Sequence, residues 1–559
     1  MATLFSLLMK QNFGDVEAAA TAWRKLGTEA ETRQSAHRHS VTGALHHGGW
    51  KGPAADSALP LLEGDERRLG MVALEATAIA VTLTRVQAQM ESAQSQLRAA
   101  VSEAEAAGHQ VSDDGQVTAP TLDPRGRNDP DFDDIERRNR GQAREFQERI
   151  TKAVNDAQQA SGDGAAALAQ LRGDILTAPR PSNGRSALAE ATADAKLVRE
   201  KFALFPSLDS GATPAENKQW WDGLSPEMQR QYLILDPDAI ANRDGVPTDI
   251  RDLANRHVLD RELDKMYSVG YPDKEKFDKD SWNTREEGLR ELRDRLDKAD
   301  GAPKGREMYL IGLDPKGDGR AVVSVGNPDT AKNTTVYVPG TESALKAMSN
   351  PGDDLDRTDR LVQASERYGN PGDTAAVLWL GYDAPDTAWA DAEFDHYAED
   401  AAPALDRYMD SLGATHEPGP RHTSILGHSY GSTVIGETIK RGDGLPVDDI
   451  IVAGSPGMHV QHAKDLKIDP NHVWAAEAMN DPVPDLGVGK HGEGGWFDLP
   501  NHPTSPDFGA NEFKTGTADG HSEYWEFDGP NVPNESLDNQ ARIITGRYSE
   551  VTKHRTAHS

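Results

Sequence analysis

Apolar residues in the N-terminal part of the chain recur at helical spacing. They step mostly by threes and fours, which predicts a long helix over 54–108 with one seam facing a partner helix; these positions are Leu69, Val72, Ala76, Ile79, Leu83, Val86, Met90 and Leu97. Polar helix formers predict a preceding helix over 14–40, and several glycines break the chain between the two. Residues 1–108 are therefore predicted to form a helical hairpin, with the ring of Trp50 buried between its helices.

Helix formers continue to about residue 300, with interruptions rich in proline, glycine and aspartate. Residues 109–131 are predicted to be a linker or an exposed hairpin. Two further helical regions are expected after it, a segment over 132–205 and a connector over 206–300.

The pattern changes near residue 300 to apolar runs that alternate with helical stretches. Continuous apolar runs predict strands covered on both faces, and long crossovers between them predict a mainly parallel sheet. The predicted strands are 308–313, 321–325, 334–338, 375–380, 423–426, 450–452 and 472–475. Residues 301–559 are therefore predicted to be an α/β domain with helices on both faces of its sheet, preceded by an all-α region.

Charge and composition narrow the function. The 559 residues include 60 Lys and Arg against 91 Asp and Glu, a formal net charge of −31, which argues against nucleic acid as a partner. The chain has no cysteine, which excludes disulfides, thiolate metal sites and a cysteine nucleophile. The best apolar stretch, 69–86, is interrupted by Glu75 and three threonines. We therefore predict no integral membrane segment, and no cleaved signal peptide because the N-terminal apolar run lacks a basic flank.

A nucleophile motif follows the predicted strand 423–426. Gly427-His428-Ser429-Tyr430-Gly431 has the pattern G-x-S-x-G, and a helical stretch, 432–440, comes directly after it. Strand, sharp turn and helix in this order are typical of a nucleophile elbow, which holds the serine hydroxyl beyond the sheet edge. Ser429 is the predicted nucleophile.

A serine nucleophile needs a base and an acid that orients the base. On this type of fold the chain order is serine, acid, histidine. Asp481 follows the predicted strand 472–475 and His521 lies in a later loop, so we predict that they are the acid and the base. The alternatives are Asp485 and Glu477 for the acid, and His491 and His502 for the base.

Two backbone amides are expected to bind the oxyanion. We assign one to Tyr430 and the other to Thr341, with Glu342 directly behind it. The pocket candidates are Glu342, Tyr382, Asp383 and His428. Two histidine groups, His459 with His462 and His491 with Asp498 and His502, match no ligand spacing, so we predict no metal and no other cofactor.

These motifs together resemble an actinobacterial α/β-hydrolase family catalogued mainly as a domain of unknown function. The resemblance rests on V-P-G-T at 338–341, W-L-G-Y-D-A-P at 379–385, G-H-S-Y-G-S at 427–432, V-A-G-S-P-G at 452–457, N-D-P-V at 480–483, F-G-A at 508–510 and G-H-S at 520–522, with W-W-D-G-L-S-P at 220–226 and A-N-R at 254–256 upstream. It implies an α/β-hydrolase fold with Ser429, Asp481 and His521 as the triad. It implies no particular substrate.

The turn Trp50-Lys51-Gly52 between two long helices resembles the WXG-type substrates of actinobacterial type VII secretion. This resemblance implies a helical protein partner for residues 1–108. It also leaves two locations open, the cytoplasm or export by a route that needs no signal peptide.

The predicted function is that of a serine hydrolase of the esterase or lipase type. The expected substrate is a lipid ester or a small acyl ester, cleaved through an acyl-enzyme intermediate. The alternative is a secretion-related interaction protein whose α/β domain is a non-catalytic scaffold.

Overall fold

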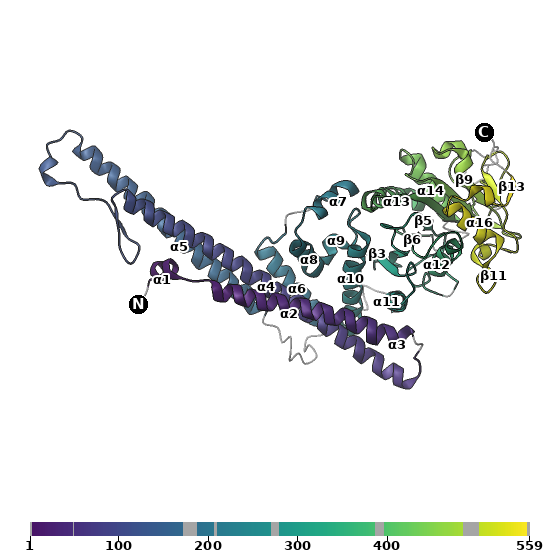
Figure 1. The fold of residues 1–559 in the computed structure, drawn as a ribbon, viewed down its shortest axis with the longest axis horizontal. Coiled ribbons are helices and arrows are strands. Elements are labelled where there is room, and N and C mark those ends of the chain that lie inside the picture. Colours follow the sequence, from purple (N-terminus) through teal and green to yellow (C-terminus); the bar gives the residue numbers. More distant parts are fainter. Residues whose placement is uncertain are drawn as a thin grey trace. The chain divides into compact units, whose positions relative to one another are not determined.

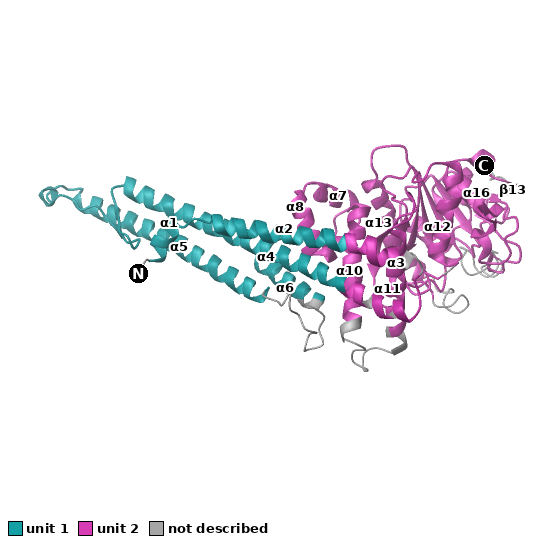
Figure 2. Ribbon diagram, turned by 60° about the horizontal axis from the view of Figure 1, so that its bottom comes forward, with its two compact units in different colours: residues 1–35, 65–206 teal, residues 36–64, 207–559 magenta. Residues whose placement is uncertain are grey.

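A computed structural model describes residues 3–47, 50–171, 187–205, 209–269, 279–350, 352–385, 396–484 and 502–555. The chain divides into two compact units (Figure 2). Unit 1 contains residues 1–35 and 65–206, and unit 2 contains residues 36–64 and 207–559.

Unit 1 is built from helices and one small hairpin (Figure 1). The helices are α1 (Leu4–Lys10), α2 (Gly14–His37), α4 (Pro53–Ala106), α5 (Phe132–Gln170) and α6 (Ala187–Lys201); residues 36–37 of α2 and 53–64 of α4 belong to unit 2. Strands β1 (Gln110–Val111) and β2 (Val117–Thr118) pair antiparallel in the segment predicted to be a linker or hairpin. A short 3₁₀ turn, Pro124–Gly126, precedes α5.

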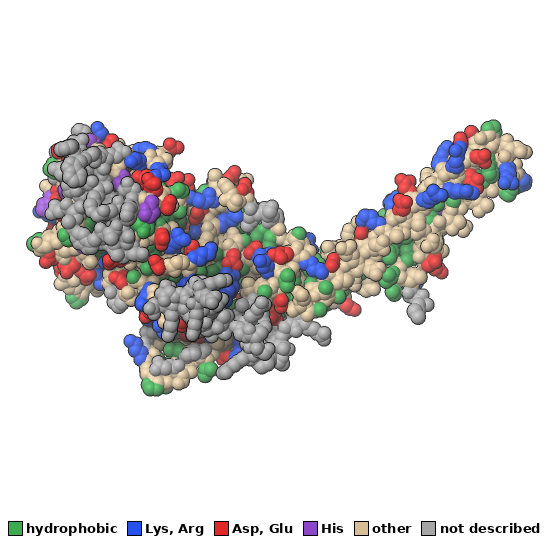
Figure 3. Space-filling view, turned by 180° about the vertical axis from the view of Figure 1, so that it is seen from behind, with side chains coloured by type: hydrophobic (Ala, Val, Ile, Leu, Met, Phe, Trp, Pro, Cys, Tyr) green, Lys and Arg blue, Asp and Glu red, His purple; other side chains and the backbone are tan. Residues whose placement is uncertain are grey.

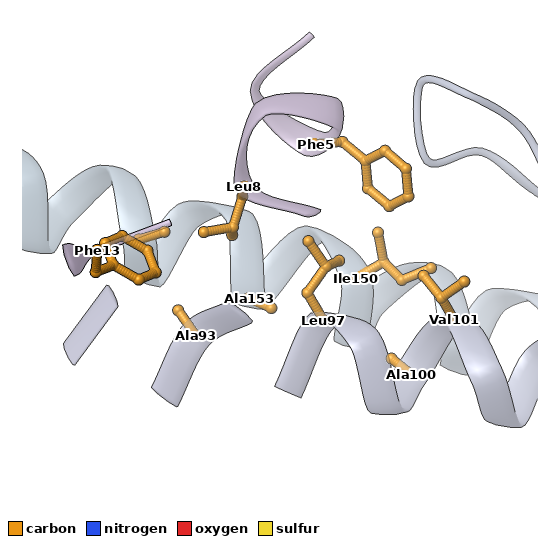
Figure 4. Close-up of a cluster of buried hydrophobic side chains, with 10 residues drawn as sticks. Phe5, Leu8, Phe13, Ala93, Leu97, Ala100, Val101, Ile150 and Ala153 are labelled. Carbon is orange, nitrogen blue, oxygen red and sulfur yellow. The ribbon is translucent and has the colours of Figure 1, made fainter. Parts of the chain in front are cut away.

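One cluster of buried apolar side chains in unit 1 joins α1, α4 and α5 (Figure 4). Phe5 and Leu8 of α1 point toward α4 and α5, where they meet small and branched side chains. The buried members of this cluster are Phe5, Leu8, Phe13, Ala93, Leu97, Ala100, Val101, Ile150, Ala153 and Ala157. Phe5 and Leu8 therefore hold α1 against α4 and α5, because the burial of their apolar surface favours the folded state.

The predicted helical seam and tryptophan cap differ from the structure. Nearly every residue from Met71 to Thr82 is buried, so α4 is covered on all sides there instead of along one seam. The prediction for Trp50 was wrong, since 39% of this residue is exposed. Its amide donates to Leu45 O over 3.3 Å, so the turn itself is closed by the backbone. The WXG resemblance and a helical partner for residues 1–108 stay predictions.

Among the described residues, α4 is the helix that is long and apolar enough to cross a membrane by length and composition alone. Most of the apolar stretch is buried inside the folded chain, and a core helix meets the same criterion. The absence of a membrane segment therefore stays a prediction.

The helices before the sheet in unit 2 are short except for two. They are a π-helical turn (Arg38–Thr42), α3 (Gly43–His47), α7 (Pro214–Asp222), α8 (Pro226–Leu235), α9 (Pro237–Ala241), α10 (Thr248–Val269) and α11 (Lys279–Ala299). A buried ion pair fixes α10 to the sheet edge: Arg256 Nε donates to Asp252 at 2.9 Å, and Asp252 accepts the amide of Leu310 at 2.7 Å. Each charge is paired and hydrogen-bonded, as burial requires.

The described part of unit 2 contains one nine-stranded mixed sheet in the order β13-β10-β9-β8-β7-β5-β6-β4-β3. Its strands are β3 (Met308–Asp314), β4 (Arg320–Val325), β5 (Asn333–Val338), β6 (Thr374–Leu380), β7 (His422–His428), β8 (Asp449–Ala453), β9 (Val473–Ala476), β10 (Asn511–Phe513) and β13 (Lys553–Arg555). The pairs from β6 through β5, β7, β8 and β9 to β10 are parallel. The pairs β3–β4, β4–β6 and β10–β13 are antiparallel. The predicted parallel core is confirmed, with antiparallel strands at both edges.

Helices cover both faces of this sheet (Figure 1). α12 (Asp354–Ser365) packs against α16 (Glu535–Ile544) on one face, and α13 (His396–Thr415) packs against α14 (Tyr430–Arg441) on the other. Further short elements are the 3₁₀ turns Glu366–Tyr368, Ala463–Leu466, Pro470–His472, Glu523–Trp525 and Tyr548–Glu550, and the hairpin β11 (Phe527–Gly529) with β12 (Val532–Pro533). On the face of unit 2 in Figure 3, acidic and basic side chains are interspersed. Because the helices cover the two faces of the sheet, the carboxyl ends of the parallel strands are followed by loops. In α/β folds, ligands bind at these strand ends.

Candidate active site

Ser429 stands at the turn between β7 and α14. Its backbone has φ 53° and ψ −129°, a conformation that L-residues rarely adopt and that costs about 1–3 kcal/mol. The Ser429 amide donates to Ala453 O on the neighbouring strand β8 at 3.1 Å. The strand, strained turn and helix make up a nucleophile elbow, as the motif predicts.

Both glycines of the motif are required by close backbone contacts. A Cβ atom on Gly427 would lie 2.7 Å from Ser432 Cα, and one on Gly431 would lie 2.2 Å from Val338 O. Side chains at either position would therefore push the elbow away from the helix or from β5. The turn can be this sharp because both flanking residues lack a side chain.

Asp481 and His521 form a direct pair. His521 Nδ1 lies 2.9 Å and 3.0 Å from the two carboxylate oxygens of Asp481. The carboxylate also accepts the Tyr524 hydroxyl at 2.6 Å and the Val483 amide at 3.0 Å. Burial would raise the pKa of Asp481, but the hydrogen bonds from His521 and Tyr524 outweigh it and lower that pKa. The pair is therefore a carboxylate with an imidazole whose proton is on Nδ1.

Backbone contacts hold the two loops together although 40 residues separate them in sequence. Met479 pairs with Asp519 as an isolated parallel bridge, and the Gly520 amide donates to Met479 O at 2.6 Å. The side chain of Asn480 donates to Asp519 at 2.7 Å. His521 follows this junction directly, so its position relative to Asp481 is fixed by the backbone.

Gly454 connects the pair to the elbow. It follows Ala453, the acceptor for the Ser429 amide, at the end of β8. Its φ is +56°, and a Cβ atom there would lie 2.6 Å from Asp481 Oδ2 and 3.0 Å from His521 Nδ1. The structure thus brings Ser429, Asp481 and His521 to one edge of the sheet around a single strand end.

The loop after β5 approaches the serine from the other side. A Cβ atom on Gly340 would lie 2.7 Å from Ser429 Cβ, so this backbone is in direct contact with Ser429. The Glu342 amide donates to Pro385 O at 2.9 Å and is thereby engaged. The Thr341 amide makes no hydrogen bond within the described part of the chain. Of the two adjacent residues, Thr341 is therefore the one with an amide left for an oxyanion.

The four predicted pocket residues have different environments. Tyr382 is buried, stacks on Trp379 with 6.1 Å between ring centroids, and donates its hydroxyl to Pro339 O at 2.7 Å. Glu342 and Asp383 are exposed. His428 is buried against His521. Tyr382 and His428 therefore support the neighbouring loops, and the assignment of all four residues to a pocket stays a prediction.

The two alternatives within the described residues, Glu477 and His502, have another polar partner. Glu477 and His502 both bind the Thr504 hydroxyl at 2.8 Å. Asp485, His491 and Asp498 lie outside the described residues. His459 binds Glu437 at 2.8 Å, and His462 lies 3.3 Å from Asp465, so each of these histidines already contacts a carboxylate.

Tyr524 and Gly454 were not predicted as site residues. Tyr524 is buried, its hydroxyl accepts the Ala478 amide at 2.9 Å, and it donates to the acid. A weak signal for Gly454 exists in the sequence, because glycine directly after a strand at the catalytic edge suggests a close approach. No such signal marks Tyr524, whose role depends on a contact across 43 residues.

A family model described as alpha/beta hydrolase matches residues 314–488. This range contains Ser429 and Asp481, and His521 lies beyond it. Among solved structures, the chain is similar to esterase PE8 with a TM-score of 0.25 and 18% identity, over 40% of this chain and 96% of that one.

Two curated relatives come from Mycobacterium tuberculosis, and both are uncharacterized. Protein Rv2079 is 31% identical over 300 residues, which is 50% of this chain and 45% of that relative. Protein Rv0963c is 35% identical over 204 residues, which is 35% of this chain and 73% of that relative. The chain thus spans less than half the length of Rv2079 and most of Rv0963c, and it belongs to the family that contains Rv0963c. Its residues 314–488 match the alpha/beta hydrolase model.

Proposed function

We propose that the chain is a serine hydrolase that cleaves carboxylic esters through an acyl-enzyme intermediate. One observation carries this proposal: His521 is bound through Nδ1 to Asp481, at the strand ends where Ser429 occupies a strained elbow. An imidazole held in this way has Nε2 left to accept a proton, which is the arrangement that a general base requires.

The reaction follows from these groups. His521 Nε2 takes the hydroxyl proton as Ser429 Oγ attacks the ester carbonyl, and the Tyr430 and Thr341 amides bind the oxyanion. The carbon–oxygen bond to the alcohol then breaks, and the alcohol leaves with the proton from His521. Water attacks the acyl-serine by the same route, releasing the acid and restoring the serine.

Carboxylic esters of lipids or of small acyl groups are the proposed substrates. An alkoxide is a better leaving group than the nitrogen of an amide, so ester cleavage makes the smaller demand on His521 as an acid. Asp481 remains ionised throughout, since its role is to orient the imidazole and stabilise its cation.

The test is labelling by a fluorophosphonate probe together with hydrolysis of p-nitrophenyl acetate, butyrate and octanoate. Ser429→Ala is expected to abolish labelling and to lower kcat by about 10³-fold or more. The matched control is Ser424→Ala on the same strand, a buried serine whose hydroxyl has no partner among the described residues. This control should retain both activities.

Turnover that survives Ser429→Ala would contradict the assignment of the nucleophile. A wild-type chain that neither labels nor hydrolyses any of the three esters would contradict the proposal as a whole. It would favour the alternative of a non-catalytic scaffold.

A further inference from the structure

A second histidine lies directly against the proposed base. The rings of His428 and His521 stack with 4.5 Å between centroids and 30° between planes. His428 Nε2 lies 2.9 Å from the backbone carbonyl of His521. His428 is 5% exposed, so both contacts are shielded from water.

Two aromatic residues fix the orientation of the His428 ring. Trp525 meets it edge to face, with centroids 4.9 Å apart and planes at 88°, and Tyr524 packs at 6.1 Å and 62°. Edge-to-face packing of this kind has a preferred geometry, so the ring is held in one rotamer. Tyr524 is also the residue that binds Asp481, so one cluster supports both members of the pair.

The position of His428 in the chain makes these contacts significant. It is the last residue of β7 and directly precedes Ser429. Its side chain therefore joins the strand that carries the nucleophile to the loop that carries the base. Asp481 binds the ring of His521, whereas His428 binds the backbone carbonyl of His521.

The protonation state of His428 follows from its partner. A carbonyl oxygen can only accept, so Nε2 must carry a proton and donate it. Burial, followed by the neighbouring His521 and Arg357, lowers the pKa of His428 well below its usual range. The ring is therefore neutral and does not repel the imidazolium that forms on His521 when Ser429 loses its proton.

We propose that His428 is a positioning residue, which holds His521 in register with Ser429 by donating to its carbonyl and stacking on its ring. The proposal rests on the proposed serine-hydrolase function. It adds a residue that takes no part in proton transfer and that acts through His521 alone.

The experiment compares three variants of the full chain. His428→Phe keeps a ring for stacking and removes the donor, whereas His428→Gln offers an amide N–H at about the reach of Nε2. The matched control is His416→Phe, because His416 Nε2 also lies 2.9 Å from a backbone carbonyl, that of Ala331, away from the site. The readouts are kcat and KM for p-nitrophenyl acetate, the rate of fluorophosphonate labelling, and thermal unfolding.

We expect His428→Phe to lower kcat and the labelling rate about 10- to 100-fold with KM changed less than about twofold, because misplaced reacting groups lose rate and not binding. His428→Gln should recover a large part of that loss, and His416→Phe should match the wild type. A purely structural role would not produce rescue by glutamine with an unchanged KM.

Three results would overturn the proposal. These are activity of His428→Phe within about threefold of wild type, equal losses in the phenylalanine and glutamine variants, and a loss confined to KM. If His428→Phe lacks a cooperative unfolding transition, His428→Gln decides alone: because it keeps a donor, a fall in its kcat of about 10-fold or more, or a change only in KM, counts against the role. An inactive and unlabelled wild type would instead contradict the proposed function, on which this role depends.

Discussion

The buried residues of helix α5 in unit 1 differ in kind from the buried charged residues of the α/β unit, unit 2. The buried positions of α5 in unit 1 are almost all small: Ala143, Ile150, Ala153, Ala157, Ala160, Gly164 and Ala167. Besides its apolar core, unit 2 buries charged side chains that are held by several hydrogen bonds, such as Asp252, Arg256, Asp449 and Asp481. Unit 1 should therefore be sensitive to added volume where small residues of α5 are packed, and unit 2 to the loss of single polar atoms.

The largest expected effect concerns the acid of the proposed triad. Asp481→Asn keeps the shape of the side chain but favours the wrong tautomer of His521, so kcat should fall by about 10³- to 10⁴-fold. The measurement is p-nitrophenyl acetate hydrolysis under saturating conditions. Glu477→Gln is the control, since this alternative acid binds Thr504 and should retain activity. The reverse result would transfer the role to Glu477.

The second effect concerns a buried carboxylate at the other end of the sheet. Asp449 is fully buried and accepts from His422 at 2.8 Å, Tyr548 at 2.8 Å, Trp474 at 2.9 Å and His472 at 3.0 Å. Asp449→Asn should lower the free energy of unfolding by about 3–5 kcal/mol, because it breaks a buried ion pair. Urea unfolding followed by tryptophan fluorescence measures this.

The same cluster predicts a pH dependence. Burial would raise the pKa of Asp449, but its four donors lower that pKa. The stability that ionised Asp449 contributes is therefore lost as pH falls through its folded-state pKa. Burial would lower the pKa of His422, but Asp449 raises that pKa. The stability that protonated His422 contributes is therefore lost as pH rises through its folded-state pKa. The difference between wild type and Asp449→Asn should be largest between about pH 4 and 6.5, the ordinary values of the two groups. A difference independent of pH would contradict this account.

The smallest effect tests the packing of unit 1 with two glycines of α5. A Cβ atom on Gly164 would lie 2.4 Å from Val86 Cγ2, whereas one on Gly162 would meet nothing within 4 Å. Gly164→Ala should therefore destabilise by about 1–2 kcal/mol, and Gly162→Ala should stabilise by about 0.5–1 kcal/mol through helix propensity. Calorimetry measures both, and ester turnover should be unchanged. Equal changes in the stability of the two variants would show that α5 is loosely packed on α4.

Local patterns were enough to predict the parallel core and the elbow. A continuous apolar strand, a G-x-S-x-G turn and a helix are adjacent in sequence, so residues 423–440 are enough to predict this order of elements. Asp481 and His521 could be proposed because the chain order on this fold is fixed. The short edge strand Lys553–Arg555 carries no such pattern and was not predicted.

Contacts between distant residues that belong to no known motif could not be predicted. The roles of Tyr524 and Gly454 depend on loops that meet only after the sheet has formed. The prediction for Trp50 failed because a hairpin turn can be closed by backbone hydrogen bonds, which leaves an aromatic side chain free to stay in solvent. The single seam predicted for α4 assumed one partner helix, whereas its middle is buried on every side.

Residues 36–64 belong to unit 2, although the segments on both sides of them belong to unit 1. Arg38 pairs with Asp260 and Glu63 pairs with Arg293, each at 2.8 Å, so this inserted segment is fastened at both ends. A deletion of residues 1–206 would therefore remove residues 36–64 of unit 2 together with unit 1.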